Sequence, residues 1–443
     1  MQLIIIFLTI IYVIIYTSPE LVIGYSWFIP TVLAMYVLIN CLYLWKYKRR
    51  QLFCFEFFFA ISFFLCCFLT PLIYEYLDKY HQSFFQISEI SIVRVCLISI
   101  IGYLFYLIGL CIKNEKLKNN VFRYNVNAVN LSNRICFSLI ILFYVLGGLQ
   151  LIYIYNADVS GGEGRFHGWG FALFFAMYAY IVSILINFSS VNISRASTWN
   201  FINSLPILFK INTGFLLIPL LLSGLRSSTL QLIIPLLLMY SISVKRISAK
   251  MMTIILLAGV VIMVFIGFNR TEGGNVFQQD NGVNYLRDFF YANSSELYLI
   301  DYADKYGATG GGNMLMPILS IIPFLQSFTA QFIDINQLPP VSSVLYTDAY
   351  NTGSGLGTNL IGDLYYSFGF LGVIVLMFIY GVFLKRCNSF KTPYGLVLLL
   401  AFSGNALFAP RVEFAYIIRS LSYCVLILYI INHSCKKTYT VVS

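Results

Sequence analysis

Charged side chains are scarce in this chain. Only 10% of its 443 residues are Asp, Glu, Lys or Arg, whereas a soluble domain has about a quarter. Hydrophobic residues make up 59% of the chain, and the mean hydropathy is +0.81. This composition excludes a soluble enzyme, a disordered chain and a nucleic-acid-binding domain. A membrane protein is the class that remains.

Histidine is also rare, and no pattern typical of a metal site or of a disulfide scaffold occurs. The chain has 3 His and 10 Cys, and the cysteines lie within apolar runs or beside basic segments. No His stands beside them at ligand spacing, so we interpret them as small apolar residues and expect no metal and no cofactor. We also expect no cleaved signal, because Met1-Gln2 offers no basic start and no small-residue cleavage site follows Tyr16.

Apolar runs long enough to cross a hydrocarbon layer of ~30 Å recur along the whole chain. They predict an all-α polytopic integral membrane protein with about 12 transmembrane helices. The seventh and eighth expected spans are short for a straight crossing, so we expect them to tilt little or to meet where the bilayer is thin. The twelve spans are 3–16, 21–45, 52–74, 92–112, 135–155, 170–188, 211–224, 229–244, 251–268, 360–384, 394–409 and 414–432.

Basic residues gather in every second connection between these spans. The positive-inside rule places those connections, and both chain termini, in the cytoplasm. The net charge of +10 therefore follows from topology, and we expect a lipid bilayer around the protein but no nucleic acid. These connections hold 19 of the 28 Lys and Arg: Lys46, Lys48, Arg49, Arg50, Lys113, Lys116, Lys118, Arg123, Arg134, Arg195, Lys210, Lys245, Arg246, Lys250, Lys385, Arg386, Lys391, Lys436 and Lys437.

The remaining basic residues fall on the outer side and are mostly Arg, a bias that topology does not explain. Arg is the better bidentate partner for phosphate and carboxylate groups. Two interpretations stay open: these Arg side chains pair with outer acids and snorkel at helix ends, or they bind an anionic substrate. The outer set is Lys79, Arg94, Arg165, Arg226, Arg270, Arg287, Lys305, Arg411 and Arg419.

One long polar segment, residues 269–356, interrupts the apolar pattern, and parity places it outside. It divides the chain into an N-terminal membrane region of about nine helices (1–268), a large outer loop (269–356) and a C-terminal membrane region of about three helices (357–443). Apolar stretches at 289–291 and 314–333 predict short helices that rest on the membrane domain.

The large outer loop carries eight acids, including Asp288, and a Tyr-rich stretch between 285 and 306. Carboxylates among Tyr and Asn suit a surface that handles polyhydroxy substrates, although any exposed loop needs polar residues. In a smaller outer loop, Glu163, Arg165 and His167 are spaced by two and could face one ligand. A flexible turn that binds nothing is the alternative.

Ionisable residues within or at the edge of a span are costly, and they are candidates for a functional site. Arg226 lies in the nearly loop-free turn Ser223-Gly224-Leu225-Arg226, and Arg270 ends the ninth span on the same side. Asp363 lies near the start of the tenth span. Arg411 and Glu413 open the twelfth, where Arg419 is expected on the helix face of Arg411. A set of structural ion pairs, such as Arg411 with Glu413 or Asp363, is the alternative.

These residues carry a family resemblance. The turn 223–228 resembles the Gly-x-Arg turn of bacterial O-antigen (oligosaccharide repeat unit) polymerases of the Wzy type. The glycine-rich segment 357–381 and the pair Arg411-Val-Glu413 with Arg419 below it also resemble that family. The general plan is similar too: about a dozen spans, termini inside and one long outer loop before the last three.

The resemblance implies a GT-C-like helical fold and a metal-independent glycosyltransferase of the bacterial inner membrane whose active site faces the periplasm. It would transfer a growing glycan from undecaprenyl diphosphate to the non-reducing end of a new lipid-linked repeat unit, in O-antigen and lipopolysaccharide biosynthesis. Lipid-linked repeat units are its implied substrates, and a chain-length regulator protein is a further candidate partner.

The resemblance also assigns roles. Arg226 matches the turn arginine of the family and Arg411 its last-span arginine, both on the departing diphosphate. Arg270 and Arg287 are added by position and chemistry. The general base is expected among Glu413, Asp288, Asp363 and His167, in that order, with Arg165 and Arg419 as further substrate-binding candidates. Segment 269–356 has no His, which makes a ligase-like His mechanism doubtful.

Two other functions compete with the polymerase. A flippase for lipid-linked oligosaccharides, or another secondary transporter, fits twelve spans, but 1–220 and 221–443 show no convincing similarity to each other. An O-antigen ligase is a closer alternative, which would move the chain to the lipid A core. Sugar identity and linkage cannot be predicted from this sequence.

Overall fold

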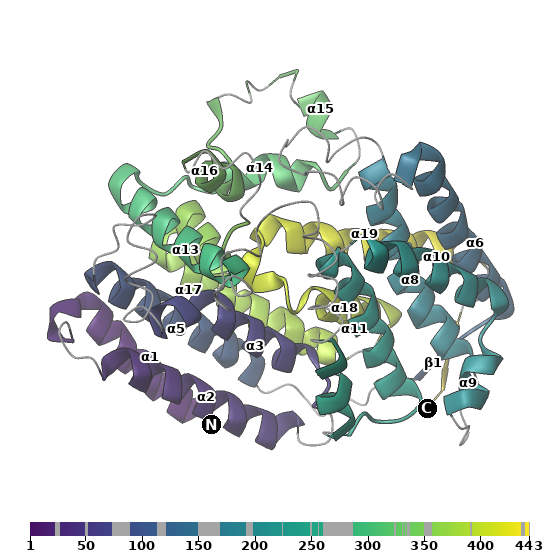
Figure 1. Cartoon of the computed structure of the whole chain (residues 1–443), viewed down its shortest axis with the longest axis horizontal. Helices are drawn as coiled ribbons and strands as arrows, with labels where there is room; N and C mark the ends of the chain where they lie inside the picture. Colours follow the sequence, from purple (N-terminus) through teal and green to yellow (C-terminus); the bar gives the residue numbers. More distant parts are fainter. Residues whose placement is uncertain are drawn as a thin grey trace, which may run out of the picture.

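The computed structural model covers the chain from Met1 to Ser443 and is almost entirely helical (Figure 1). Every structural statement below refers to the residues whose positions the structure describes. These are 1–22, 27–48, 52–72, 89–112, 121–148, 169–191, 198–223, 225–248, 250–255, 257–259, 287–322, 325–329, 331–332, 334, 337–349, 357–389, 392–435 and 439–442.

The N-terminal part consists of helices and one short strand. Its elements are α1 (Gln2–Thr17), η1 (Pro19–Leu21), α2 (Phe28–Lys48), α3 (Phe55–Cys67), α5 (Glu89–Cys111), strand β1 (Val121–Tyr124), α6 (Val126–Phe143), the π-helical turn η2 (Tyr144–Gly148), α8 (Trp169–Ser190), α9 (Thr198–Ser204), α10 (Ile207–Leu222) and α11 (Arg226–Ser243).

The C-terminal part begins with four helices inside the expected outer loop and ends with three long or apolar ones. They are α13 (Arg287–Tyr306), α14 (Gly312–Leu319), α15 (Leu325–Thr329), α16 (Ser342–Ala349), α17 (Leu360–Asn388), α18 (Pro393–Asn405), the 3-10 turn η6 (Ala409–Arg411), α19 (Phe414–Ser434) and strand β2 (Tyr439–Val442). In Figure 1, α14, α15 and α16 form a layer above α17, α18 and α19.

Long apolar helices confirm a polytopic membrane protein, but not the count of twelve crossings. Six helices of the described chain are long and apolar enough to span a membrane. A seventh span results if α9 and α10, bent by 99° at their junction, are taken as one. Other expected spans coincide with apolar helices of 10–17 residues, which at 1.5 Å per residue reach at most ~26 Å. That length is short of the ~30 Å layer.

Several connections that are distant in sequence contact one another, which indicates that they lie on the same side of the bundle. Antiparallel pairing of β1 with β2 joins the connection before α6 to the C-terminal tail. The Gln2 amide donates to the Cys111 carbonyl, and Lys48 and Asn388 both contact Glu56. All of these residues lie beside connections or termini that the basic residues predicted to share one side. The pairing supports that division; which side is cytoplasmic stays a prediction.

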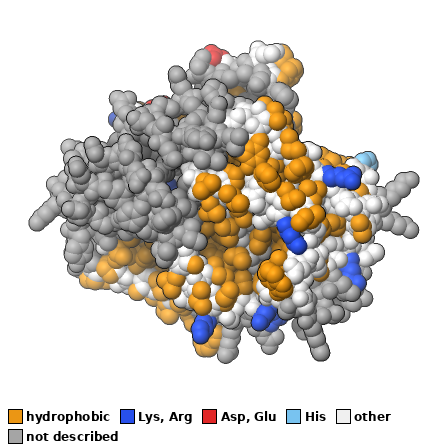
Figure 2. Space-filling view, turned by 45° about the vertical axis from the view of Figure 1, so that its right-hand side comes forward, with side chains coloured by type: hydrophobic (Ala, Val, Ile, Leu, Met, Phe, Trp, Pro, Cys, Tyr) orange, Lys and Arg blue, Asp and Glu red, His pale blue; other side chains and the backbone are white. Residues whose placement is uncertain are grey.

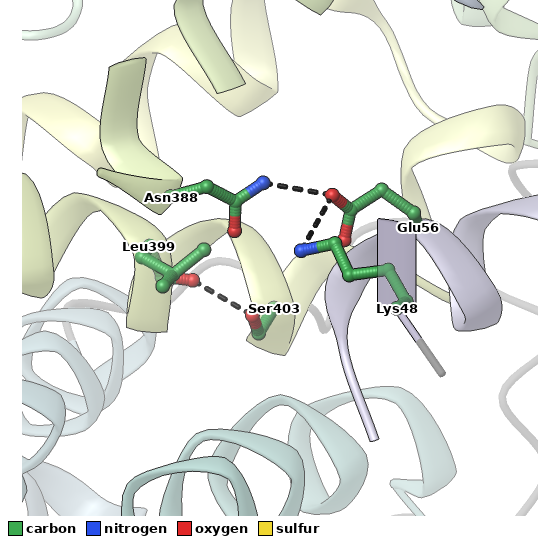
Figure 3. Close-up of polar contacts among 5 residues, drawn as sticks. All are labelled: Lys48, Glu56, Asn388, Leu399 and Ser403. Atoms are coloured by element: carbon green, nitrogen blue, oxygen red, sulfur yellow. Dashed lines mark hydrogen bonds and ion pairs between the residues drawn. The ribbon is translucent and has the colours of Figure 1, made fainter. Parts of the chain in front are cut away.

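The Glu56 contacts form a small polar cluster between three helices (Figure 3). Lys48 Nζ, in the last turn of α2, lies 3.0 Å from Glu56 Oε1 in α3. Asn388 Nδ2, at the end of α17, donates to the same oxygen at 2.7 Å. The Glu56 side chain is 3% exposed, so this cluster fixes the ends of α2, α3 and α17 to one another inside the protein.

The centre of the bundle is the pair α5 and α17, which pack closely along their length. Their glycines allow this approach: a Cβ added to Gly381 would lie 2.1 Å from the Tyr106 carbonyl oxygen, and one on Gly109 would lie 2.4 Å from that of Phe378. Small residues at such contacts let two membrane helices bring their backbones together. Beside this pair, the rings of Tyr103, Tyr106 and Tyr380 all contact the ring of Phe59 of α3.

Hydrophobic side chains cover much of the outer surface, as Figure 2 shows. On α10, the exposed side chains Ile207, Phe215, Ile218 and Leu222 follow one stripe of the helix. An apolar stripe of this kind on the outside of a bundle is suited to contact with lipid rather than water.

Candidate active site

The start of α19 is a short turn, an extended residue and a helix cap in succession. The 3-10 turn η6 begins at Ala409, contains Pro410 and ends at Arg411. Val412 is extended (φ −129°, ψ 161°), and Glu413 is the N-cap of α19. This break corrects the expectation that Arg411 and Arg419 share a helix face: helical periodicity cannot relate the two, because Arg411 precedes the helix.

Glu413 is held by a residue of the expected outer loop. Both the backbone N–H of Ser343 (3.4 Å) and its hydroxyl donate to Glu413 Oε1. Burial raises the pKa of the Glu413 carboxyl, and the two bonds from Ser343 and the charge of Arg419 partly oppose that rise. Glu413 is thus a partly accessible carboxylate with two neighbours, Ser343 and Arg419, that stabilise its charged form.

A second carboxylate, Asp363, lies beside the first. The backbone N–H of Phe414 donates to Asp363 Oδ2 at 2.9 Å, and Asn313 Nδ2 lies 3.4 Å from Oδ1. Asn313 also donates to the Ser367 hydroxyl at 2.9 Å. The Asp363 side chain is 1% exposed, so it joins the first turns of α17 and α19 to α14 rather than facing an open surface.

The start of α17 is fixed by its own cap. Asn359 Oδ1 accepts from the backbone N–H groups of Ile361 (2.8 Å) and Gly362 (3.3 Å), which satisfies two donors of the first turn. Its amide nitrogen points to α3, 3.4 Å from the Cys66 carbonyl oxygen. Gly357 precedes this cap with φ +80°, and a Cβ there would lie 3.7 Å from the Arg411 carbonyl oxygen. The two chain segments therefore run side by side.

Helix α13 packs its polar side against α3, α5 and α17. Glu296 is fully buried and accepts from the Ser99 hydroxyl, while Asn293 donates to the Cys67 carbonyl at 2.9 Å. Burial raises the pKa of Glu296 to about 8. A Cβ on Gly362 would lie 2.9 Å from the Glu296 Cα. This segment of the expected outer loop is thus part of the protein core.

Two further candidate arginines, Arg419 and Arg226, lie on α19 and α11. Arg419, in the second turn of α19, lies over the rings of Tyr416 (5.1 Å) and Phe174 (5.9 Å). Arg226 is the first residue of α11, and Gln231 of the same helix donates to Asn405 Oδ1 (3.2 Å) and to the Tyr416 hydroxyl (3.3 Å). The second turn of α11 is therefore bonded both to the end of α18 and to the first turn of α19.

The other predicted residues are placed less fully. Arg287 and Asp288 open α13, and only their backbone is described. Arg165, His167 and Arg270 lie outside the described residues. The structure therefore brings together Glu413, Asp363 and the start of the helix that carries Arg419. The grouping of Arg226, Arg270 and Arg287 with them stays a prediction.

Sequence reasoning missed several polar residues near this end of the bundle. Arg94 Nη1 lies 2.5 Å from Asp304 Oδ2, and the Tyr365 hydroxyl donates to Asp304 Oδ1 at 2.7 Å. Ser343 and Asn313 were not predicted either, because an exposed loop contains many such residues and nothing in the sequence marks these two. Within the described residues, no three His, Cys, Asp or Glu side chains come together as metal ligands would.

The fold and this cluster define a polytopic helical membrane protein with two neighbouring carboxylates, one buried and one partly accessible, at one end of its bundle. Residues 206–439, more than half of the chain, match the family model O-antigen polysaccharide polymerase Wzy. The chain belongs to this family, which makes it a membrane-embedded polymerase that joins O-antigen units by glycosyl transfer. No curated protein and no solved structure matches the chain.

Proposed function

We propose that this protein lengthens O-antigen by moving the growing glycan from undecaprenyl diphosphate onto the non-reducing end of a new lipid-linked repeat unit. In this reaction the bond between the anomeric carbon and the diphosphate oxygen breaks. A bond between that carbon and an acceptor hydroxyl forms, and the hydroxyl proton passes to a carboxylate. The diphosphate leaves on its lipid. The family match over residues 206–439 is the observation that carries this proposal.

Glu413 is the best candidate to receive the proton. Its carboxylate is partly accessible, whereas Asp363 is 1% exposed and already binds a backbone N–H and an amide. Burial raises the pKa of Glu413, and a carboxylate with a raised pKa is a better base at neutral pH. Asp363 acts as a positioning residue, because it ties α17 and α14 to the first turn of α19.

Arginines at the same end of the bundle would bind the diphosphate. Arg411 lies two residues before Glu413, and Arg419 contributes positive charge to the Glu413 environment. Arg226, at the start of α11, would complete the group. Guanidinium groups bind phosphate in a bidentate way and stabilise the negative charge that develops as the sugar leaves. This site would face the periplasm, with both termini in the cytoplasm.

Substitution of the two family-matched arginines tests the proposal. We expect Arg226→Ala and Arg411→Ala to leave the protein in the membrane but to abolish long chains, so that single-unit glycolipid accumulates. Arg386→Ala, an exposed arginine at the other end of the bundle, is the control and keeps long chains. Wild-type chain length in both site variants would reject the assigned roles.

Bacterial strains that carry these variants also distinguish the polymerase from the two competing functions. Loss of a flippase leaves the lipid-linked unit on the inner face of the membrane. Loss of a ligase leaves long chains on undecaprenyl diphosphate that never reach the lipid A core. Only loss of a polymerase gives single units on the outer face, which can be detected by accessibility of the sugar to an external lectin or glycosidase.

A further inference from the structure

A row of tyrosine rings runs along α13, beside rings of α16 and α17. Tyr298, Tyr302 and Tyr306 are spaced by four residues, so they follow one side of the helix over ~12 Å. The ring centroids of Tyr302 and Tyr306 are 4.6 Å apart, and those of Tyr298 and Tyr302 are 6.0 Å apart. We call these three rings the tyrosine track.

Two buried rings support the track from below. Tyr346 of α16 lies 5.9 Å from Tyr298, and Tyr366 of α17 lies 5.8 Å from Tyr302 in an edge-on arrangement. Tyr366 is 1% exposed, and its hydroxyl donates to the Pro340 carbonyl at 3.2 Å. These contacts fix the orientation of the track, so a ligand could bind to it without a further ordering step.

The outer end of the track is open and has polar neighbours. Tyr306 is 64% exposed, and Lys305 Nζ lies 5.0 Å from its ring centre. Asp301 of the same helix is also exposed, whereas Asp304 already pairs with Arg94 and Tyr365. An exposed aromatic face on a helix that also carries an exposed carboxylate combines an apolar surface for sugar C–H groups with an acceptor for sugar hydroxyls.

The other rings of the track contact the two helices that carry residues of the candidate active site. Tyr298, at the inner end, lies 5.9 Å from Tyr346 of α16, the helix whose Ser343 donates to Glu413. Tyr302, in the middle, lies 5.8 Å from Tyr366, which is three residues after Asp363 in α17. The rings thus lead from the solvent-exposed end of α13 toward the carboxylate pair at the start of α19. The tyrosine track is ~12 Å long, which is longer than one sugar ring. Its ligand would therefore be an oligosaccharide rather than a single sugar.

We propose that the tyrosine track binds the glycan of the lipid-linked substrate, by stacking of successive sugar rings on Tyr302 and Tyr306. This inference rests on the proposed function and extends it by naming where the saccharide lies. A polymerase that holds its glycan in this way would retain the chain between successive transfers, so the track would also influence chain length.

Binding of a free saccharide tests the track without involving the lipid diphosphate. The probe is an oligosaccharide of two or three O-antigen repeat units released from its lipid, titrated calorimetrically into the purified full-length protein. We expect Tyr306→Ala to raise the Kd about tenfold, the loss of one aromatic contact. Tyr306→Phe and Tyr306→Trp keep the ring and should remain within about twofold of the wild type.

Tyr47 offers a matched control at the opposite end of the bundle. It also stacks with the tyrosine four residues before it (Tyr43, 5.2 Å), lies under a lysine (Lys46, 5.4 Å) and is 42% exposed. Tyr47→Ala should leave the Kd unchanged. Equal Kd values for the wild type and Tyr306→Ala, or an equal loss in Tyr47→Ala, would overturn the proposal.

The outcome is separable from that of the proposed function. If Arg226→Ala and Arg411→Ala keep long chains while Tyr306→Ala loses the saccharide, the track stands and the arginine roles fall. If the arginine variants lose long chains but Tyr306→Ala binds saccharide normally, the track falls and the polymerase stands. In bacterial cells, the Tyr306→Ala protein should still join repeat units, but the most frequent chain length of its product should be shorter than with Tyr306→Phe.

Discussion

Ser343 donates two hydrogen bonds to Glu413, one from its backbone N–H and one from its hydroxyl, across 70 residues of sequence. The contact joins α16, in the expected outer loop, to the cap of the last long helix. It thus makes the loop a part of the candidate active site rather than a separate cover. Both bonds stabilise the ionised carboxylate, so they act directly on the proton affinity of the proposed base.

Removal of the Ser343 hydroxyl should change the pH dependence of polymerisation. Activity requires the ionised form of Glu413, so it falls as pH drops through the pKa of that carboxyl. In Ser343→Ala the pKa rises further, because one bond to the charged form is lost, and the acid limb of the pH profile moves to higher pH. The initial rate with lipid-linked units in detergent, measured from pH 5 to 9, should fall more at acid than at alkaline pH.

Glu413→Gln provides the companion measurement. A positioned general base contributes about 10²-fold or more to a transfer of this kind, so the variant should lose at least that factor at every pH. Its residual rate should show no acid limb. Ser422→Ala serves as the control, because Ser422 lies in the same helix and its hydroxyl donates to the Ile418 carbonyl of that helix. An acid limb in Glu413→Gln that matches the wild type would assign the base to another residue.

Glu296 predicts a pH-dependent stability. Its carboxyl is buried in α13, outside the candidate spans, and burial raises its pKa to about 8, whereas an unfolded Glu titrates near ~4.3. Between these values the unfolded state binds fewer protons than the folded state. The free energy of unfolding therefore falls as pH rises through this window, by at most about 1.4 kcal/mol per pH unit.

Substitution of this residue should flatten the dependence. In Glu296→Gln the thermal midpoint in detergent should change less between pH 5.5 and 8.5 than that of the wild type, and it should exceed the wild-type value at the alkaline end. Glu20→Gln, an exposed acid in η1, should follow the wild-type curve. A Glu296→Gln curve with the full wild-type slope would assign the dependence to other groups.

The apolar helices could be predicted from sequence because hydropathy reports lipid-facing and core residues alike. The spans expected at 170–188 and 414–432 correspond to α8 and α19 with bounds shifted by two residues or less. Helix α6 begins at Val126, nine residues before the expected span. Its first turns are rich in Asn, and Asn133 bonds to Asn187 and Ser183 inside the bundle. Hydropathy alone does not assign these buried Asn residues to a membrane helix, because it takes no account of the side chains that satisfy their hydrogen bonds.

Polar burial also explains what remained hidden at the site. Helix α13 resembles a soluble segment by composition, yet Asn293, Ser295 and Glu296 are buried against α3, α5 and α17. Asp363 and Glu413 could be chosen from the sequence, since a carboxylate at the edge of a span is unusual. Their partners could not be chosen, because a pairing over 50 or 70 residues depends on how the helices pack.

Because α5 and α17 lie so close together, we expect the single methyl group added by a Gly→Ala substitution between them to lower the stability strongly. A Cβ on Gly381 would lie 2.1 Å from the Tyr106 carbonyl oxygen, a backbone atom that cannot move aside alone. Gly381→Ala should lower the free energy of unfolding by about 2 kcal/mol through overpacking. Gly214→Ala in α10, whose nearest neighbour would be Ile218 at 3.9 Å, should be neutral or slightly stabilising. Thermal unfolding of both variants in detergent compares them.

In the polar cluster around Glu56, at the opposite end of the bundle, we expect the charges of Lys48 and Glu56 to depend strongly on each other for stability. Lys48 lies 3.0 Å from Glu56, whose side chain is 3% exposed. Lys48→Met would leave that carboxylate buried with only the Asn388 amide beside the same oxygen, and loss of one partner of a buried pair costs about 3 kcal/mol or more. Lys46→Met, two residues earlier and exposed, should change the free energy of unfolding by less than about 0.5 kcal/mol.

A double variant separates the ion pair from simple loss of packing. In Lys48→Met combined with Glu56→Leu no buried charge remains, so much of the stability lost in Lys48→Met alone should return. The free energies of unfolding of the two single variants and the double variant form a mutant cycle. The cycle should give a coupling of at least about 1 kcal/mol. Additive effects, or a Lys48→Met variant as stable as Lys46→Met, would show that the cluster does not hold α2, α3 and α17 together.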